Sequence, residues 1–140
     1  MGSVFTKIIA GELPARFVWK DERVVAFLTI APARPGHTLV VPREEVDHWL
    51  DADRGLMSHL MEVSRSIGQA IQEAFQPPKV ALLIAGLEVP HLHVHLIPIW
   101  TLEDIDATKV DRNPRPADLD HAAEKIRGAL ATLGFAERTR

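Results

Sequence analysis

Three histidines at alternate positions are the residues in this sequence best suited to chemistry. The stretch PHLHVHLIP, residues 90–98, holds His91, His93 and His95, which are three of the chain's seven histidines. Imidazole can attack an electrophile, exchange a proton near neutral pH or bind a metal ion. Because the intervening residues are aliphatic and strand side chains alternate, the pattern predicts a β-strand with all three imidazoles on one face.

The spacing makes the three histidines unequal. A strand rises about 3.3 Å per residue, so neighbouring histidines lie about 6.6 Å apart along it and the outer two about 13 Å apart. A single metal or phosphorus atom therefore cannot be equidistant from all three. His93 is central, and His91 and His95 can flank a ligand on either side of it.

Three interpretations of this strand are open. A solvated strand face usually mixes Lys, Glu, Thr and Ser, which these residues do not. A His-x-His metal site needs a third ligand, and no local spacing favours any of the candidates His37, His48 and Glu88. A neutral His93 can instead attack phosphorus covalently while its neighbours donate to phosphate oxygens or the leaving group. The lack of cysteine and of a carboxylate cluster favours this last interpretation, with no metal ligand expected.

The elements that must position these residues follow from hydrophobic periodicity. It predicts a short helix capped by Ser3 and stopped by Gly11, a long helix over 52–75 capped by Asp51 or Asp53, and a C-terminal helix over 119–135. Strands are predicted over 16–19, 24–30, 37–42, 79–86 and 91–99. The run KVALLIAG, residues 79–86, is continuously apolar, which predicts a central strand buried on both faces.

This order of elements predicts an α+β fold. The sheet is expected to have five mostly antiparallel strands, with the long helix packed on the aliphatic face of the histidine strand and the C-terminal helix added. A chain of 140 residues fits a single domain, with a core over about 3–100 and a C-terminal arm and helix over about 101–140.

Composition excludes several classes of function. The net charge of −3 without a Lys/Arg block argues against nucleic-acid binding. No apolar run approaches the length of a membrane span, and the first residues lack the features of a signal peptide. These observations predict a cytoplasmic protein that binds neither membranes nor nucleic acid.

The stretch HLHVHLI fits the signature His-φ-His-φ-His-φ-φ, where φ is aliphatic, and resembles the histidine triad (HIT) family at every position. Further stretches resemble the family in the right order: FTKIIAGELP its opening helix, VVAFLTIAPARPGHTLVVPR its nucleoside-pocket strands, and AGLEVPHLHVHLIP its glycine turn and triad strand. The resemblance covers roughly residues 3–100.

The resemblance implies a small nucleotide hydrolase or transferase that needs no metal or cofactor and commonly forms a homodimer. His93 would attack the α-phosphate of a purine nucleotide, such as a nucleoside phosphoramidate or dinucleoside polyphosphate. His95 would help to hold the phosphate, and His91 would support the nucleophile or the leaving group. The residues expected to contact the nucleotide are Phe27, Leu28, Thr29, Ile30, His37, Leu39, Leu87 and Glu88.

Several positions depart from the family pattern. Ser3 and Thr6 stand where many members have a zinc-binding Cys-x-x-Cys, so no zinc is expected there. Thr29 replaces a ribose-binding Asp, and Leu87 and Ile99 replace a Gln and an Arg. Replacement donors could come from the arm, at Lys109, Arg112, Asn113 or Arg115, although a solvated surface loop is the favoured interpretation of these residues. The alternatives to an enzyme of this type are a nucleotide-binding regulatory protein with vestigial catalysis and, less favoured, a His-x-His metalloenzyme.

Overall fold

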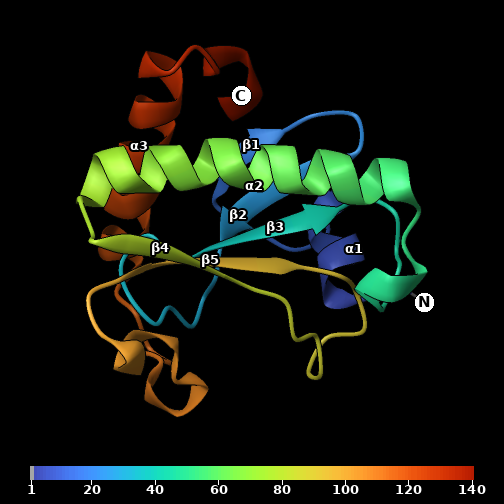
Figure 1. Ribbon diagram of the computed structural model, residues 1–140, viewed down its shortest axis with the longest axis horizontal. Helices are drawn as coiled ribbons and strands as arrows, with labels where there is room; N and C mark the ends of the chain where they lie inside the picture. The colour runs from blue at the N-terminus through green and yellow to red at the C-terminus, as the bar shows by residue number, and fades with distance from the viewer. Residues whose placement is uncertain (1) are drawn as a thin grey trace.

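The computed structural model describes residues 2–140, and one open antiparallel sheet organises it (Figure 1). The sheet has five strands in the order β1-β2-β3-β5-β4. The strands are β1 (Phe17–Lys20), β2 (Val24–Leu28), β3 (Thr38–Pro42), β4 (Lys79–Leu83) and β5 (Val94–Ile99). The helices are α1 (Val4–Ile9), α2 (Arg54–Phe75) and α3 (Pro116–Thr132), with short 3-10 helices η1 (Trp49–Asp51), η2 (Leu102–Ile105), η3 (Ala107–Lys109) and η4 (Ala136–Thr139). The expected α+β fold is confirmed.

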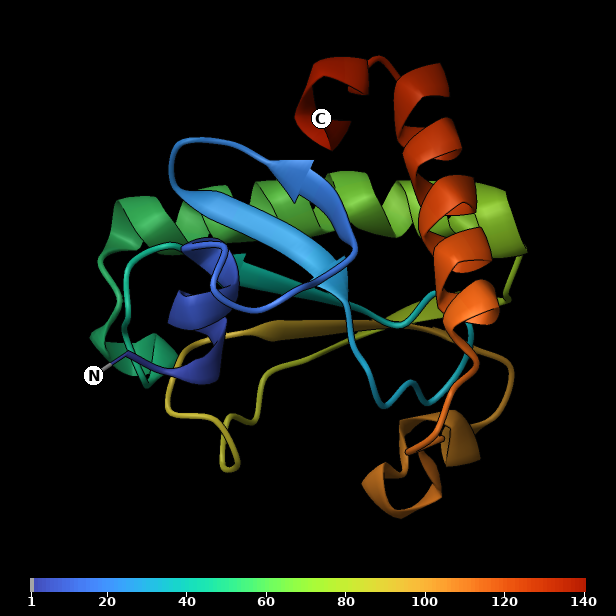
Figure 2. The same ribbon diagram turned by 180° about the vertical axis from the view of Figure 1, so that it is seen from behind.

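The long helix α2 covers one face of the sheet, and α1 lies on the opposite face (Figures 1 and 2). Of the two candidate caps, Asp53 begins α2, because its Oδ1 accepts a hydrogen bond from the Leu56 backbone N–H at 2.7 Å. The predicted apolar stripe of α2 packs on the aliphatic side chains of the histidine stretch, as expected. The buried residues in this contact include Leu56, Leu60, Val63, Ile67, Ile71, Leu92, Val94 and Leu96.

The strand β4 corrects one prediction. It is an edge strand paired only with β5 among the described strands, and it ends at Leu83 rather than Gly86. Leu82 and Leu83 are 44% and 42% exposed, so the expectation of a central strand buried on both faces was wrong. A continuous apolar run indicates that both faces of a strand are apolar. It does not indicate how many strands lie beside it.

Two other strands are shorter than predicted by at least two residues, and β3 is shorter by one. β2 ends at Leu28 instead of residue 30, since the chain turns at Thr29. β5 begins at Val94, so His91 and His93 precede the regular strand. Their segment pairs with the loop after β3, where the Leu92 N–H donates to the Val46 carbonyl at 2.6 Å.

The C-terminal segment packs back onto the sheet and α2. The arm over 101–115 forms η2 and η3 and crosses the β2–β3 loop, where the Asp111 N–H donates to the Pro32 carbonyl at 2.9 Å. α3 begins at Pro116 and ends at Thr132, three residues earlier at both ends than the expected 119–135, and Leu133, inside the expected range, is 42% exposed. No helix within residues 2–140 is long and apolar enough to cross a membrane.

Candidate active site

His91 is the most enclosed of the three histidines. Its side chain has no exposed surface, and its ring packs against the edge of Phe5 from α1, with ring centroids 5.7 Å apart. Nε2 donates to the Pro42 carbonyl at 2.7 Å, since a carbonyl can only accept. Nδ1 is therefore the acceptor of the Ser3 hydroxyl at 2.7 Å. Both ring nitrogens of His91 are bound to the protein, and neither is left for a ligand.

A small polar network joins the start of α1 to His91. The Ser3 N–H and the Thr6 hydroxyl donate to the Glu45 carboxylate at 2.6 and 2.7 Å, and Ser3 Oγ also accepts from the Thr6 N–H at 3.1 Å. The backbone N–H of Ser3 is the main cause that lowers the pKa of Glu45. Nothing in the sequence pattern pointed to Glu45, because its partners lie about forty residues away in the chain.

This donor set does not fit a zinc ion. Ser3 and Thr6 contribute hydroxyl groups, whereas zinc prefers sulfur and imidazole ligands. His48 takes no part in the network; its side chain caps η1 by accepting from the Leu50 N–H at 3.3 Å. Within residues 2–140, no three His, Asp or Glu side chains are arranged to hold a metal ion.

His93 has a free nitrogen with a defined protonation state. Its Nδ1 donates to the backbone carbonyl of His91 at 2.7 Å, so in the neutral ring the proton is on Nδ1 and Nε2 carries a lone pair. Burial lowers the pKa of His93, which keeps the ring neutral at neutral pH. The Phe5 ring lies edge-on at 4.9 Å between centroids. Nε2 has no hydrogen-bond partner among residues 2–140. It is not one of the buried atoms that lack a partner, so it must be in contact with solvent.

His95 lies beside His93 and contacts a fourth histidine. The rings of His93 and His95 are 4.9 Å apart between centroids. Burial, followed by the neighbouring His93, lowers the pKa of His95 to about 4. On its other side, His95 Nδ1 is 2.9 Å from Nε2 of His37, one of the residues expected to contact the nucleotide. His37 is only 5% exposed and lies behind His95 rather than on the open surface.

The other expected nucleotide contacts divide among several environments. Phe27 and Leu39 pack with Phe5 on the histidine side of the sheet, whereas Leu28 belongs to the core on the α2 side. Thr29 Oγ1 accepts from the Ala31 N–H at 3.1 Å, so its hydroxyl retains one proton for a ligand.

Three further expected contacts are exposed. Ile30 is 75% and Leu87 97% exposed, and Glu88 is exposed on the same loop as Leu87. The negative charge of Glu88 raises the pKa of His93, although burial outweighs this effect. Glu88 is thus electrostatically coupled to the free nitrogen.

The arm supplies no obvious replacement donors to these residues. Lys109 pairs with Glu103 at 3.0 Å and Arg115 with Asp118 at 3.0 Å, and both are exposed. Arg112 and Asn113 are exposed as well. These residues behave as a solvated surface loop in this structure.

A comparison with protein families accounts for the histidine arrangement. The model of the HIT domain family matches residues 10–101. The chain belongs to the HIT family. The match includes all three histidines of the signature and the strands that carry the expected nucleotide contacts.

Relatives extend this match to most of the chain. Protein hit of Bacillus subtilis is 33% identical over 138 residues, covering 92% of this chain and 94% of that protein. A histidine triad nucleotide-binding protein from Sulfolobus tokodaii, described as hypothetical, superposes with a TM-score of 0.82 at 30% identity and covers 92% of both chains. A HIT family hydrolase of Legionella pneumophila has a TM-score of 0.60 at 29% identity, covering 67% of this chain and 89% of that one. Membership supports a nucleotide-binding or hydrolase protein of the HIT type.

Proposed function

We propose that this chain hydrolyses or transfers nucleotides by attack of His93 Nε2 on an α-phosphate. The observation that carries the proposal is the tautomer of His93. Its Nδ1–H is occupied by the His91 carbonyl at 2.7 Å, which leaves an unprotonated nitrogen open to solvent on a neutral ring. A nucleophile needs such a lone pair, and here no separate base has to remove a proton first.

The proposed reaction has two displacements. In the first, the Nε2 lone pair forms a bond to the α-phosphorus, and the bond from phosphorus to the leaving group breaks. The leaving group keeps that electron pair and takes up a proton from water. In the second, water attacks phosphorus, the phosphorus–nitrogen bond breaks, and the nucleoside monophosphate leaves with His93 restored. An acceptor alcohol or amine in place of water would make the reaction a transfer.

The proposed substrate is a purine nucleoside phosphoramidate or a dinucleoside polyphosphate. Ile30, which is 75% exposed, offers apolar surface for a base, whereas Phe27 and Leu39 are buried at 2% and 6% exposure. Thr29 has one hydroxyl proton to donate to a sugar, whereas a carboxylate would accept from two sugar hydroxyls. We therefore expect weak selection for the ribose. The cytoplasmic location of the protein stays a prediction made from the sequence alone.

The decisive experiment is mass spectrometry of a quenched reaction. The protein is mixed with adenosine phosphoramidate in EDTA, quenched in alkali and digested. We expect one added nucleoside monophosphate on the peptide that holds His93, and neither adduct nor turnover in His93→Ala. The matched control is His121→Ala, which removes an exposed histidine of α3 and should behave as the wild type.

Two other outcomes would replace the proposal. Tight AMP binding without adduct or turnover would make the chain a nucleotide-binding regulatory protein. Activity that disappears in EDTA and returns with zinc would make it a metalloenzyme. A diadenosine polyphosphate run in parallel distinguishes an unsuitable leaving group from an inactive site.

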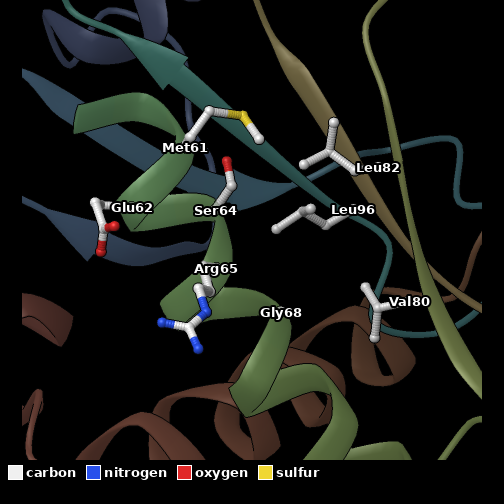
Figure 3. Close-up of a pocket in the computed structure, with 8 residues that line it drawn as sticks. All are labelled: Met61, Glu62, Ser64, Arg65, Gly68, Val80, Leu82 and Leu96. Atoms are coloured by element: carbon white, nitrogen blue, oxygen red, sulfur yellow. The ribbon is translucent and has the colours of Figure 1, made fainter. Parts of the chain in front are cut away.

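We also propose that two copies pair through the free edge of β4. Beside this edge lies a groove of about 380 Å³ between α2 and the sheet (Figure 3), on the face away from the histidines. It is lined by Met61, Glu62, Ser64, Arg65, Gly68, Val80, Leu82 and Leu96. The Ser64 hydroxyl is buried there without a partner among the described residues.

The charges in the groove favour a second copy as its occupant. Glu62 and Arg65 lie one helical turn apart, so a twofold axis would bring each beside its opposite charge on the partner. An exposed apolar edge such as Leu82 and Leu83 is also a template for strand pairing. We expect a dimer by sedimentation velocity and a monomer for Leu82→Lys. Leu102→Lys, at an exposed leucine of η2, is the control; a monomeric wild type would refute the pairing.

A further inference from the structure

A fourth histidine lies behind the signature and has both ring nitrogens engaged. His37, in the loop before β3, accepts at Nδ1 from the Ala33 backbone N–H at 3.0 Å. Its Nε2 lies 2.9 Å from Nδ1 of His95. The two residues are 58 positions apart in the chain, so this contact exists only in the fold.

The Ala33 N–H determines how protons are distributed along this chain of rings. A backbone N–H always donates, so His37 Nδ1 must be unprotonated. The neutral His37 then carries its proton on Nε2 and donates it to His95. His95 Nδ1 must in turn accept, which leaves the single proton of a neutral His95 on Nε2.

We propose that His37 is a positioning residue that holds His95 neutral with its proton on Nε2. Nε2 of His95 has no hydrogen-bond partner among residues 2–140, and it is not one of the buried atoms that lack a partner, so it is in contact with solvent. Its proton is therefore available at the surface beside His93. The consequence for catalysis rests on the function proposed above: the Nε2–H donates to an oxygen of the phosphate that His93 attacks. Donation by a neutral group does not change with pH across the neutral range.

The same network resists protonation of His95. An imidazolium at His95 carries a proton on Nδ1, which would face the Nε2 proton of His37. Relief requires His37 to move its proton to Nδ1, where it would oppose the Ala33 N–H. Each charged state therefore breaks one hydrogen bond in the interior, in agreement with the pKa of His95 near 4.

Burial and the neighbouring histidines lower the pKa of His37 and of His95, and within residues 2–140 no carboxylate is among the causes for either ring. The neighbours of His95 on β3 and β4 are Leu39 and Leu83, and His93 lies on its own segment. His37 shares a cavity with Arg34, Asp111 and Asp118. The Arg34 guanidinium is paired with Asp104 of η2 at 2.7 Å, and Asp118 is paired with Arg115 at 3.0 Å.

The test uses an isosteric pair of substitutions. In His37→Gln the amide still accepts from Ala33 and still donates to His95. In His37→Glu the carboxylate can only accept, so His95 must place a proton on Nδ1. The tautomer and titration of His95 are read without any substrate by two-bond proton–nitrogen correlation spectra of the imidazoles, assigned with His95→Gln.

The wild type and His37→Gln should show His95 neutral, with its proton on Nε2, down to about pH 5, in line with the low pKa of His95. His37→Glu should shift the titration of His95 upward, to about pH 6.5 or above. A wild-type His95 that carries its proton on Nδ1, or that titrates with its ordinary midpoint, would overturn the inference even if the glutamate variant fails to fold.

Activity gives a second and separate readout. The kcat/KM of the wild type and of His37→Gln should be flat between about pH 6 and 8. In His37→Glu it should fall about tenfold or more as rising pH removes the Nε2 proton of His95. Correct spectra with no turnover in any protein would contradict the proposed function alone, whereas unchanged spectra in His37→Glu would contradict the role of His37 alone.

Discussion

Replacing Ser3 by alanine or by glycine separates the two roles of one hydroxyl group. Ser3 Oγ caps α1 by accepting from the Thr6 N–H at 3.1 Å, and it donates to the buried Nδ1 of His91 at 2.7 Å. Alanine removes both bonds. Glycine also removes both, but it is a tolerable N-cap that costs only a few tenths of a kcal/mol relative to serine.

The expected magnitudes follow from these partners. Losing the cap costs about 1 kcal/mol in alanine. Leaving the His91 nitrogen unpaired in the interior costs a further ~1–3 kcal/mol. Ser3→Ala should therefore lower the free energy of unfolding by about 2–4 kcal/mol. Ser3→Gly should lower it by about 1–3 kcal/mol, because glycine keeps most of the capping free energy and loses only the hydrogen bond to His91.

Urea denaturation at pH 7 measures both variants. The matched control is Thr132→Ala, which removes an exposed hydroxyl that donates to the Gly128 carbonyl at 3.1 Å and should change stability by less than about 0.5 kcal/mol. If Ser3→Gly is as stable as the wild type, the hydrogen bond between Ser3 and His91 contributes nothing to stability, and the predicted loss is refuted.

Other predictions concern pH and backbone conformation. Burial, followed by the neighbouring His95, lowers the pKa of His37 from about 6.5 in the unfolded chain to about 3, so the stability from its neutral form is complete above pH 6.5 and is lost as the pH falls. Urea titrations should show a loss of about 2 kcal/mol from this residue between pH 7 and 5, absent in His37→Gln. Gly36→Ala should destabilise by about 2 kcal/mol or more, because φ is +96° and a Cβ would lie 2.6 Å from the Phe75 ring. Gly128→Ala, in α3 with nothing within 4 Å of the added carbon, should instead stabilise by about 0.5–1 kcal/mol in the same assay.

Local patterns predicted all three helices, because the information for a helix lies within a few turns, although α3 begins and ends three residues before the expected 119–135. The long helix was expected over 52–75 and lies over Arg54–Phe75, since its apolar stripe and its ends are set by neighbours in the sequence. The exposed edge of β4 was not expected, since its burial depends on how many strands lie beside it. That number is a property of the whole sheet.

For the candidate site, the sequence predicted which residues take part but not the hydrogen bonds between them. The histidine signature identified His93 as the central residue, and the fold supplies its free nitrogen. The contacts that define the protonation of its neighbours join Ser3 to His91 across 88 positions and His37 to His95 across 58. No periodic pattern carries such pairings, and a hydroxyl or imidazole gives no sign in the sequence of the partner it will meet.

The buried position of His91 suggests which other residue could replace it in distant relatives. Its two nitrogens bridge the Pro42 carbonyl and the Ser3 hydroxyl, and no part of the side chain is exposed. A glutamine amide also combines a donor and an acceptor in one plane, and could span the same two groups. A search that demands all three histidines would pass over such chains.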